Sequence, residues 1–258
     1  MSVLSVPFIL SAFLIFVRVA ALVGTAPYFS SGSFPIRIKL FLALVLTVVL
    51  SPAIPAHSVS LAYDTHALQI LILIIKEFLV GAAMGLTGQL IFAGIRMGGE
   101  LMSVNMGLSF ASVIDPVTQS RHSVVNQLFG MYAILIFISI GGDRFYIQAL
   151  SKSFSIVPVG AADMALAGPV FIKVAAYLFV VGVQMAAPFI IVLFLLDLSF
   201  AIFARIMPQA NIFFIALPLK LGIGIILMLL ILPYTPTAFH NFFDQLWYFL
   251  DMLLHAVF

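Results

Sequence analysis

The residues 67–95, ALQILILIIKEFLVGAAMGLTGQLIFAGI, form one long apolar run that carries only two charges, Lys76 and Glu77. About 20 apolar residues in a helix cross the hydrocarbon core of a bilayer, and this run is longer than that. Within it, Gly81 and Gly85 have a spacing that lets two helix backbones approach closely where lipid provides no hydrophobic driving force. The run therefore predicts a long membrane helix that packs tightly on another helix.

The same apolar character recurs along the chain. With about 20 residues as the length of a span, the candidate segments are 3–23, 38–55, 67–95, 124–142, 170–204 and 212–232. The connections between them are short and rich in turn residues, and none is long enough to separate domains. We therefore expect an all-α fold of membrane-associated helical hairpins, with about six apolar helical segments, that forms one unit over residues 1–258.

Composition supports a membrane protein and excludes several other classes. Of the 258 residues, 64% are hydrophobic and only 8% are charged, whereas ordinary soluble domains have roughly 25% charged residues. The net charge of +2 comes from single, scattered residues, so no basic face is available to bind nucleic acid. The absence of cysteine excludes disulfides and thiol chemistry.

Patterns typical of catalysis or of metal binding are missing from the sequence. The five histidines show no metal-ligand spacing, and the patterns GxSxG, HExxH and GxxxxGK do not occur. We therefore expect that the protein is not an enzyme and that it binds no metal and no cofactor.

Ionisable side chains within or at the edges of the apolar segments are the first unusual feature. Arg18, Lys76, Glu77, Asp197 and Lys220 all fall there. In hydrocarbon such a group costs about 2.5 kcal/mol or more, and it usually faces a protein interior or a wet cavity. These residues are too many for a simple lipid-facing bundle, so we expect them to meet protein groups.

Two charge spacings leave alternatives open. Arg96 and Glu100 are four residues apart, on one face of a helix if the third segment continues beyond 95. This pair is either solvated at a helix end or directed at an interior pore or a neighbouring subunit. Asp197 and Arg205 lie on one side of a helix but are too distant to pair directly. Helix anchoring by buried ion pairs is a better interpretation of these two than a proton relay.

Prolines are the second unusual feature. Pro7, Pro188 and Pro218 interrupt apolar runs, and each removes a helical hydrogen bond, so we expect some helices to be broken by proline. Broken helices occur in transporters and also in subunits packed inside larger assemblies, so a secondary transporter or small-solute channel stays open as an alternative function. The sequence lacks the inverted halves that favour this alternative.

One stretch, GLSFASVIDPVTQSRHS at 107–123, is neither a span nor an amphipathic helix. Asp115 followed by Pro116 favours a turn, so an ordinary loop between helices is one interpretation. Apolar side chains at four positions argue against free solvation, namely Leu108, Phe110, Val113 and Ile114. They favour a loop lodged in a protein-lined space, where irregular backbone at membrane depth is tolerated.

Three stretches carry a resemblance to a known family. They are FVRVAALVGTAPYFSSGSFPIRIKLFLALVLTVVLSP at 16–52, GGELMSVNMGLSFASVIDP at 98–116 and PQANIFFIALPLKLGIG at 208–224. With them, the chain resembles the FliR family of flagellar export-gate subunits and their type III secretion counterparts over most of its length. The motif GGDRF at 141–145 departs from the family, which often has Asp-Gly-His there, and we attach no function to it.

The resemblance implies a non-enzymatic subunit of the flagellar protein export apparatus. Such a subunit assembles with FliP-like and FliQ-like subunits into a hetero-oligomeric helical gate, with an FlhB-like subunit nearby. The gate lies in the bacterial inner membrane at the flagellar basal body and conducts unfolded export substrates. The resemblance also implies that a FliP-like N-terminal part is joined to a FliQ-like C-terminal part.

The resemblance further implies roles for particular residues. A loop of these subunits plugs the closed pore, and here the plug corresponds to Gly107, Leu108, Ser109, Phe110, Ala111, Ser112, Val113, Ile114, Asp115 and Pro116. This loop must move for export. Packing on other subunits would also account for buried charges at subunit or helix contacts, which we expect at Arg18, Arg96, Glu100, Asp197, Arg205 and Lys220.

Overall fold

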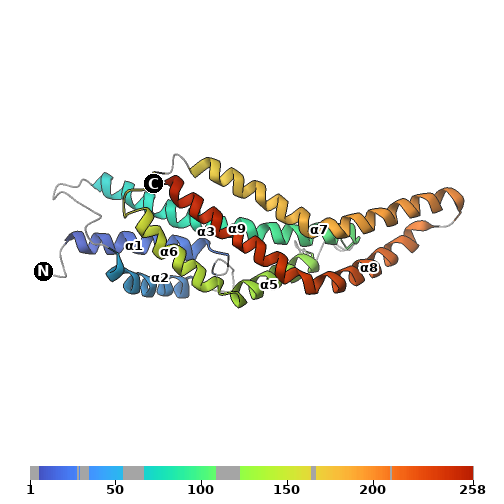
Figure 1. Ribbon diagram of the computed structural model, residues 1–258, viewed down its shortest axis with the longest axis horizontal. Helices are drawn as coiled ribbons and strands as arrows, with labels where there is room; N and C mark the ends of the chain where they lie inside the picture. The colour runs from blue at the N-terminus through green and yellow to red at the C-terminus, as the bar shows by residue number, and fades with distance from the viewer. Residues whose placement is uncertain are drawn as a thin grey trace. The chain divides into compact units, whose positions relative to one another are not determined.

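The computed structural model describes residues 6–27, 29, 35–54, 67–108, 123–163, 167–209 and 211–257, and within these ranges every regular element is helical (Figure 1). The α-helices are α1 (Val6–Thr25), α2 (Ile36–Leu50), α3 (Ala67–Asn105), α5 (Val124–Ser139), α6 (Gly142–Ile156), α7 (Ala167–Ile206), α8 (Ile212–Ile231) and α9 (Thr235–Val257). Two short 3-10 turns follow α2 and α8, at Ser51–Ala53 and Leu232–Tyr234. The all-α fold expected from the sequence is confirmed.

The six expected apolar segments each overlap a helix. Two further helices, α6 and α9, were not expected. Among the described residues, four helical stretches are long and apolar enough to cross a membrane, or five if α5 and α6 form one span. The fourth stretch joins α8 and α9. In contrast, α2 has 15 residues, fewer than the roughly 20 that a span needs. The chain is therefore a multi-pass membrane protein in which α2 is a shorter apolar helix.

Two compact units make up the chain. Unit 1 consists of Met1–Leu90, Gly141–Ala175 and Asp244–Phe258, and unit 2 consists of Ile91–Ile140 and Ala176–Phe243. Three helices, α3, α7 and α9, each contribute residues to both units. The chain therefore passes from one unit to the other within these three helices and once more in the turn between α5 and α6.

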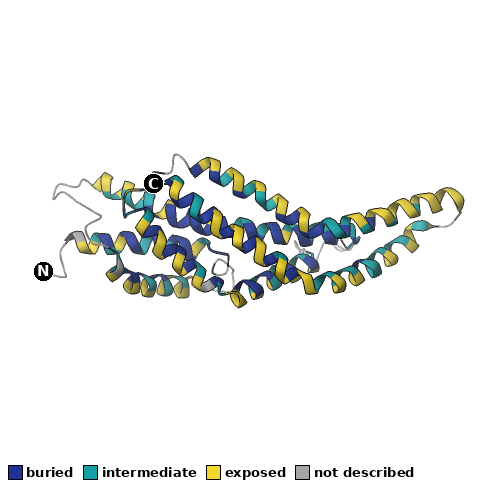
Figure 2. Ribbon diagram, in the orientation of Figure 1, coloured by how far each residue is buried: buried dark blue, intermediate teal, exposed yellow. Residues whose placement is uncertain are grey.

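The helices α6 and α9 were not among the expected segments because each has a polar face. On α6 the buried residues recur at helical spacing, among them Tyr146, Leu150, Ser153 and Phe154. On α9 a similar stripe is buried, namely Phe239, Phe242, Phe243, Leu246, Leu250, Leu253 and Leu254. The opposite faces carry polar and charged residues, so each helix is amphipathic. The mean hydropathy of each helix is therefore lower than that of a simple membrane span. Figure 2 shows this alternation of buried and exposed residues along the helices.

Glycines of α3 bring it into close contact with one helix in each unit. In unit 1, a Cβ atom at Gly81 would lie 2.9 Å from the Cβ of Ala21 on α1, and one at Gly85 would lie 2.8 Å from the amide nitrogen of Ala26. In unit 2, a Cβ at Gly94 would lie 2.7 Å from the carbonyl oxygen of Leu178 on α7. The tight packing predicted from the glycine spacing is confirmed, since no larger residue fits at these positions.

An aromatic cluster fills the core of unit 2. Phe92 of α3 packs edge-on against Phe137 of α5, with ring centroids 5.4 Å apart. Phe243 contacts both rings, at 5.3 Å from Phe92 and 4.9 Å from Phe137. Aromatic pairs at these distances add to the apolar area that they bury. The cluster therefore joins α3, α5 and the first half of α9.

The prolines do not divide their helices as the sequence led us to expect. Pro188 lies inside α7 and Pro218 inside α8, and both helices continue through them. Pro7 lies in the first turn of α1, where the amide hydrogen has no partner within the helix in any case. A single missing hydrogen bond is compatible with a continuous helix when the turns on both sides remain intact. The expectation of helices broken at these prolines is therefore corrected.

The close approach of α3 to α1 gives a first prediction. Replacement Gly81→Ala places a methyl group against the backbone of Arg18 and the Cβ of Ala21, and overpacking of this kind costs about 1–3 kcal/mol. We expect a lower midpoint for heat aggregation of the detergent-solubilised protein. The matched control is Gly24→Ala in α1, where an added Cβ meets nothing within 4 Å. Equal midpoints for the two variants would contradict the tight α1–α3 contact.

Candidate functional site

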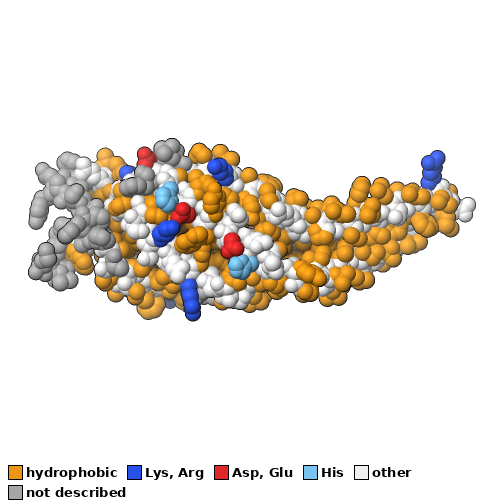
Figure 3. Space-filling view, in the orientation of Figure 1, with side chains coloured by type: hydrophobic (Ala, Val, Ile, Leu, Met, Phe, Trp, Pro, Cys, Tyr) orange, Lys and Arg blue, Asp and Glu red, His pale blue; other side chains and the backbone are white. Residues whose placement is uncertain are grey.

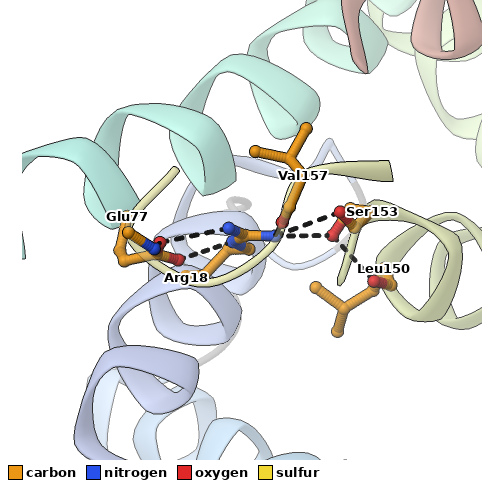
Figure 4. A network of polar contacts seen from close by, with 6 residues as sticks. Arg18, Glu77, Leu150, Ser153 and Val157 are labelled. Atoms are coloured by element: carbon orange, nitrogen blue, oxygen red, sulfur yellow. Dashed lines mark hydrogen bonds and ion pairs between the residues drawn. The ribbon is translucent and has the colours of Figure 1, made fainter. Parts of the chain in front are cut away.

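A buried ion pair joins α1 to α3 in the core of unit 1. Arg18 and Glu77 are both 0% exposed. The Nε of Arg18 donates to Glu77 Oε2 at 2.6 Å, and Nη2 donates to Oε1 at 3.1 Å (Figure 4). The two parallel hydrogen bonds match the planar guanidinium to the planar carboxylate, which is the strongest geometry for such a pair.

The other side of the Arg18 guanidinium is satisfied by the C-terminal end of α6 and the turn that follows. Nη1 donates to the carbonyl oxygen of Val157 at 3.0 Å and to the carbonyl oxygen of Ser153 at 3.3 Å (Figure 4). The guanidinium also lies 4.4 Å from the centre of the Phe154 ring. Glu77 accepts a further hydrogen bond from the amide of Gly160 at 2.8 Å. One arginine therefore joins three segments that are distant in the sequence.

This network explains how an arginine can occupy an apolar helix. A buried charge is tolerated when an opposite charge and additional hydrogen bonds replace its hydration shell. Here the carboxylate and the carbonyls come from the chain itself. Because both side chains are closed off from solvent, the network positions α1, α3 and α6 and does not offer a binding surface.

A second ion pair joins α7 to α8 in unit 2. Lys220 Nζ lies 2.5 Å from Asp197 Oδ1. The lysine side chain is 20% exposed and the aspartate side chain is 52% exposed. The sequence singled out both residues but did not indicate that they pair with each other, since 23 positions separate them.

The remaining charged residues expected at contacts have mixed surroundings. Arg96 is exposed, and its side-chain stem packs against Gly130 of α5, where an added Cβ would lie 3.3 Å from the Arg96 Cγ. Glu100 is half-buried and accepts a hydrogen bond from Asn126 Nδ2 at 3.2 Å. In the part of the chain that the structure describes, no ion pair joins Arg96 to Glu100. Arg205 is exposed in the last turn of α7, where the helix dipole favours a cation. Whether these residues contact other subunits stays a prediction.

The expected plug begins at the end of α3. Gly107 has φ of 83°, a left-handed conformation that favours glycine. Its amide donates to the Val104 carbonyl at 3.1 Å, and the Leu108 amide donates to the Ser103 carbonyl at 3.1 Å. These two bonds form a Schellman motif, which ends the helix at a defined residue. The rest of the plug prediction, Ser109 to Pro116, lies outside the described residues.

Both flanks of the 109–122 segment are fixed within unit 2. Before the segment, the Met106 side chain packs on Gly224 of α8. A Cβ atom added at Gly224 would lie 2.9 Å from the Sδ of Met106, so the methionine fills the space that a side chain would need. After it, Ser123 caps α5, because its Oγ accepts a hydrogen bond from the Asn126 amide at 3.1 Å. The residues on either side of the segment are thus held by packed helices.

These features define a class of protein. The chain is a multi-pass, all-helical membrane protein in which two ion pairs, Arg18–Glu77 and Asp197–Lys220, join helices within the units. Among the described residues, no group of three His, Cys, Asp or Glu side chains is placed to hold a metal. Its helices nevertheless leave many large apolar side chains on the surface, above all on α2, α7 and α8. Figure 3 shows hydrophobic side chains over much of one face of the molecule.

Comparison with known proteins identifies the family. The model of the family described as bacterial export proteins, family 1, matches residues 9–246. The chain is 34% identical to the flagellar biosynthetic protein FliR of Escherichia coli (strain K12) over 230 residues, which are 89% of this chain and 87% of that protein. It is 32% identical to FliR of Aquifex aeolicus (strain VF5) over 244 residues, 94% of this chain and 93% of that protein. The chain therefore belongs to this family of export proteins.

Membership of the family confirms the resemblance seen in the sequence. FliR of Bacillus subtilis (strain 168), 30% identical over 235 residues that are 90% of this chain and 89% of that protein, extends the likeness to a further bacterium. The chain is a component of flagellar protein export, and its family is one of export proteins and not an enzyme family.

Sequence reasoning missed several groups that complete these contacts. Ser153 and Gly160 contribute a carbonyl and an amide to the Arg18 network, and no sequence signal marks a backbone group. Asn126 was also missed, although an amide side chain in the apolar segment 124–142 is a detectable signal, since a polar group there needs a partner.

The Arg18 network gives a second prediction. The variant Arg18→Ala leaves Glu77 buried without its partner, and breaking a buried pair in this way costs about 3–5 kcal/mol. We expect the variant to lose heat stability in detergent and to accumulate poorly. The control is Lys152→Ala, which breaks the exposed Lys152–Asp251 pair, a type worth about 0–1 kcal/mol. The assignment fails if Arg18→Ala and Lys152→Ala are equally stable.

Proposed function

We propose that this protein is a structural, pore-forming subunit of the flagellar type III protein export gate. It assembles with FliP-like and FliQ-like subunits in the bacterial inner membrane at the flagellar basal body, next to an FlhB-like subunit. The gate conducts unfolded export substrates during flagellum assembly. The proposal extends from the family to which the chain belongs to the particular place of this subunit in the export apparatus.

The observation that carries the proposal is the lack of packing around α8. Of its 20 residues only Gly224 is buried. Large apolar side chains project from it, including Phe213, Phe214, Ile226 and Leu229, and α8 also bears Lys220, which is paired with a half-exposed Asp197. A helix that faces only lipid rarely keeps ionisable groups at its centre. This combination supports a helix that other subunits cover.

The segment that follows α3 supports the pore-forming part of the proposal. Its apolar residues Phe110, Val113 and Ile114 suit a seal in a protein-lined channel. Its flanks are fixed by the Gly107 turn and the Ser123 cap. A segment with fixed flanks and an apolar middle can close a pore and still be displaced by a passing chain, so we assign the plug to 107–116.

The two-part origin of the chain also belongs to the proposal. A FliP-like N-terminal part and a FliQ-like C-terminal part would let one chain contact both FliP-like and FliQ-like subunits. The charged residues Arg96, Glu100, Asp197, Arg205 and Lys220 would lie at such contacts. A secondary transporter or channel is less well supported, because α7 and α8 continue through the prolines that suggested broken helices.

The plug assignment gives a third prediction. Deletion of Ser109 to Pro116 keeps the residues that end α3 and the Ser123 cap and removes the apolar seal. In cells that also produce FliP-like and FliQ-like subunits, we expect the membrane to become leaky to ions and small solutes, measured as loss of membrane potential and dye entry. Leakage requires assembly, so cells without the partner subunits serve as the control.

A length-matched variant separates the seal from the length of the segment. Phe110→Ser, Val113→Ser and Ile114→Ser combined keep every backbone position and remove only the apolar side chains. We expect a leak smaller than that of the deletion, because the polar segment still fills part of the pore.

The matched control for this triple variant lies just beyond the plug. Thr118→Ser combined with Gln119→Ser changes side chains of the same segment without touching the apolar residues, and we expect a tight membrane. A tight membrane with the deletion and with the triple variant, in cells where the complex assembles, would overturn the plug assignment.

A further inference from the structure

The helix α2 is packed on one side only. It contacts α1, and its buried residues, Ala43, Thr47 and Leu50, recur at spacings of four and three, which places them on one side of the helix. Most of its other residues are exposed (Figure 2). We call the exposed apolar residues beyond its first turn the outer face of α2, namely Leu40, Phe41, Leu44, Val45, Val48 and Val49.

The outer face of α2 has neither polar groups nor small residues. Within residues 40–50 the only polar side chain is that of Thr47, which is buried and donates its hydroxyl to the Ala43 carbonyl oxygen at 2.7 Å. Helices associate in membranes through small residues and polar contacts, and α2 has both on its buried side. In contrast to α8, which bears Lys220, the outer face of α2 presents no group that acyl chains leave unsatisfied. Its chemistry therefore favours lipid over a helix of another subunit.

Two cations lie in the first turn of α2. Arg37 is exposed and Lys39 is half-buried, and within the described ranges neither side chain forms an ion pair. Helix geometry places their Cα atoms about 5.5 Å apart, so the two long side chains can reach one phosphate group. Guanidinium and ammonium groups bind phosphate oxygens through charge-assisted hydrogen bonds.

The length of α2 matches that of a lipid molecule in one leaflet. Its 15 residues extend about 22 Å at 1.5 Å per residue. One leaflet with its headgroup layer is about 20–22 Å thick, half of a whole bilayer. The charged first turn and the apolar remainder of α2 thus have the order and the total length of a headgroup and its acyl chains. The comparison is with the lipid molecule itself, so it requires no depth for the other helices.

We propose that the outer face of α2, together with Arg37 and Lys39, binds an anionic phospholipid. The two cations hold the phosphate group, and the acyl chains lie along the outer face. An anionic lipid is favoured over a zwitterionic one, because no cation of its own headgroup cancels the negative charge. The contact is with the membrane and not with another subunit, so it goes beyond the export-gate function proposed above and does not depend on it.

Removal of the two charges tests this site. Arg37→Gln combined with Lys39→Gln leaves the outer face intact. The full chain in detergent is titrated with phosphatidylglycerol, and the lipid adducts are counted by native mass spectrometry. We expect the unaltered chain to prefer phosphatidylglycerol to phosphatidylcholine, and the affinity of the variant for phosphatidylglycerol to be about tenfold lower or less, because each basic residue adds to the attraction for anionic lipid. Equal affinities of the variant and the unaltered chain would overturn the inference.

The chain offers a control that removes the same number of charges. Lys173 and Arg205 are both exposed on α7, but they lie 32 residues apart and cannot hold one phosphate group. We expect Lys173→Gln combined with Arg205→Gln to bind phosphatidylglycerol within about twofold of the unaltered chain. A loss as large as that of the α2 variant would show that only the overall charge matters, which contradicts a site on α2.

A photo-cross-linking residue at Phe41 identifies the occupant of the outer face. In membranes of cells that also produce FliP-like and FliQ-like subunits, we expect adducts with phospholipid. Adducts with a partner subunit, or with a second copy of this chain, in place of lipid would overturn the inference. The same residue at Phe214 of α8 is the comparison, because the proposed function predicts a partner subunit there. Failure of the proposed function is thus detected at Phe214, and failure of the lipid contact at Phe41.

Discussion

The bidentate contact between Arg18 and Glu77 is the interaction on which unit 1 depends. Neither side chain can remain in an apolar interior alone, so each fixes the position of the helix that carries the other. The guanidinium then binds the end of α6 through Ser153 and Val157, and the carboxylate binds the Gly160 amide. Glycines at 81 and 85 allow the α1 and α3 backbones to come close enough for this contact.

The two units satisfy their charges differently. In unit 1 the internal pair is closed off, and Arg18 is 0% exposed. In unit 2 the pair of Asp197 and Lys220 lies on a hairpin whose apolar residues are largely uncovered. The proposed function accounts for this difference, because other subunits would then cover the α7–α8 hairpin. This contrast suits a subunit of an export gate, since such a subunit needs both a core that holds itself together and a surface that other subunits cover.

The sequence predicted the features that depend on local composition. The apolar segments became helices, and the glycine spacings of α3 became close contacts. The helices α6 and α9 were missed because Lys152 and Asp251 lie on polar faces that lower the mean hydropathy. The pairing of Arg18 with Glu77, 59 residues apart, depends on tertiary packing that no local pattern encodes. The expected breaks at Pro188 and Pro218 did not occur, because the neighbouring turns continue both helices.

The central claim is that protein, and not lipid, covers the α7–α8 hairpin. The chain has no cysteine, so a single cysteine introduced at Ile202 or Phe214 carries a spin label at one defined site. Oxygen dissolves in lipid, and its collision rate with the label reports exposure to acyl chains. The account predicts a high collision rate for the chain alone in a bilayer and a low rate when FliP-like and FliQ-like subunits are bound. A rate that stays high in the assembled complex would contradict it.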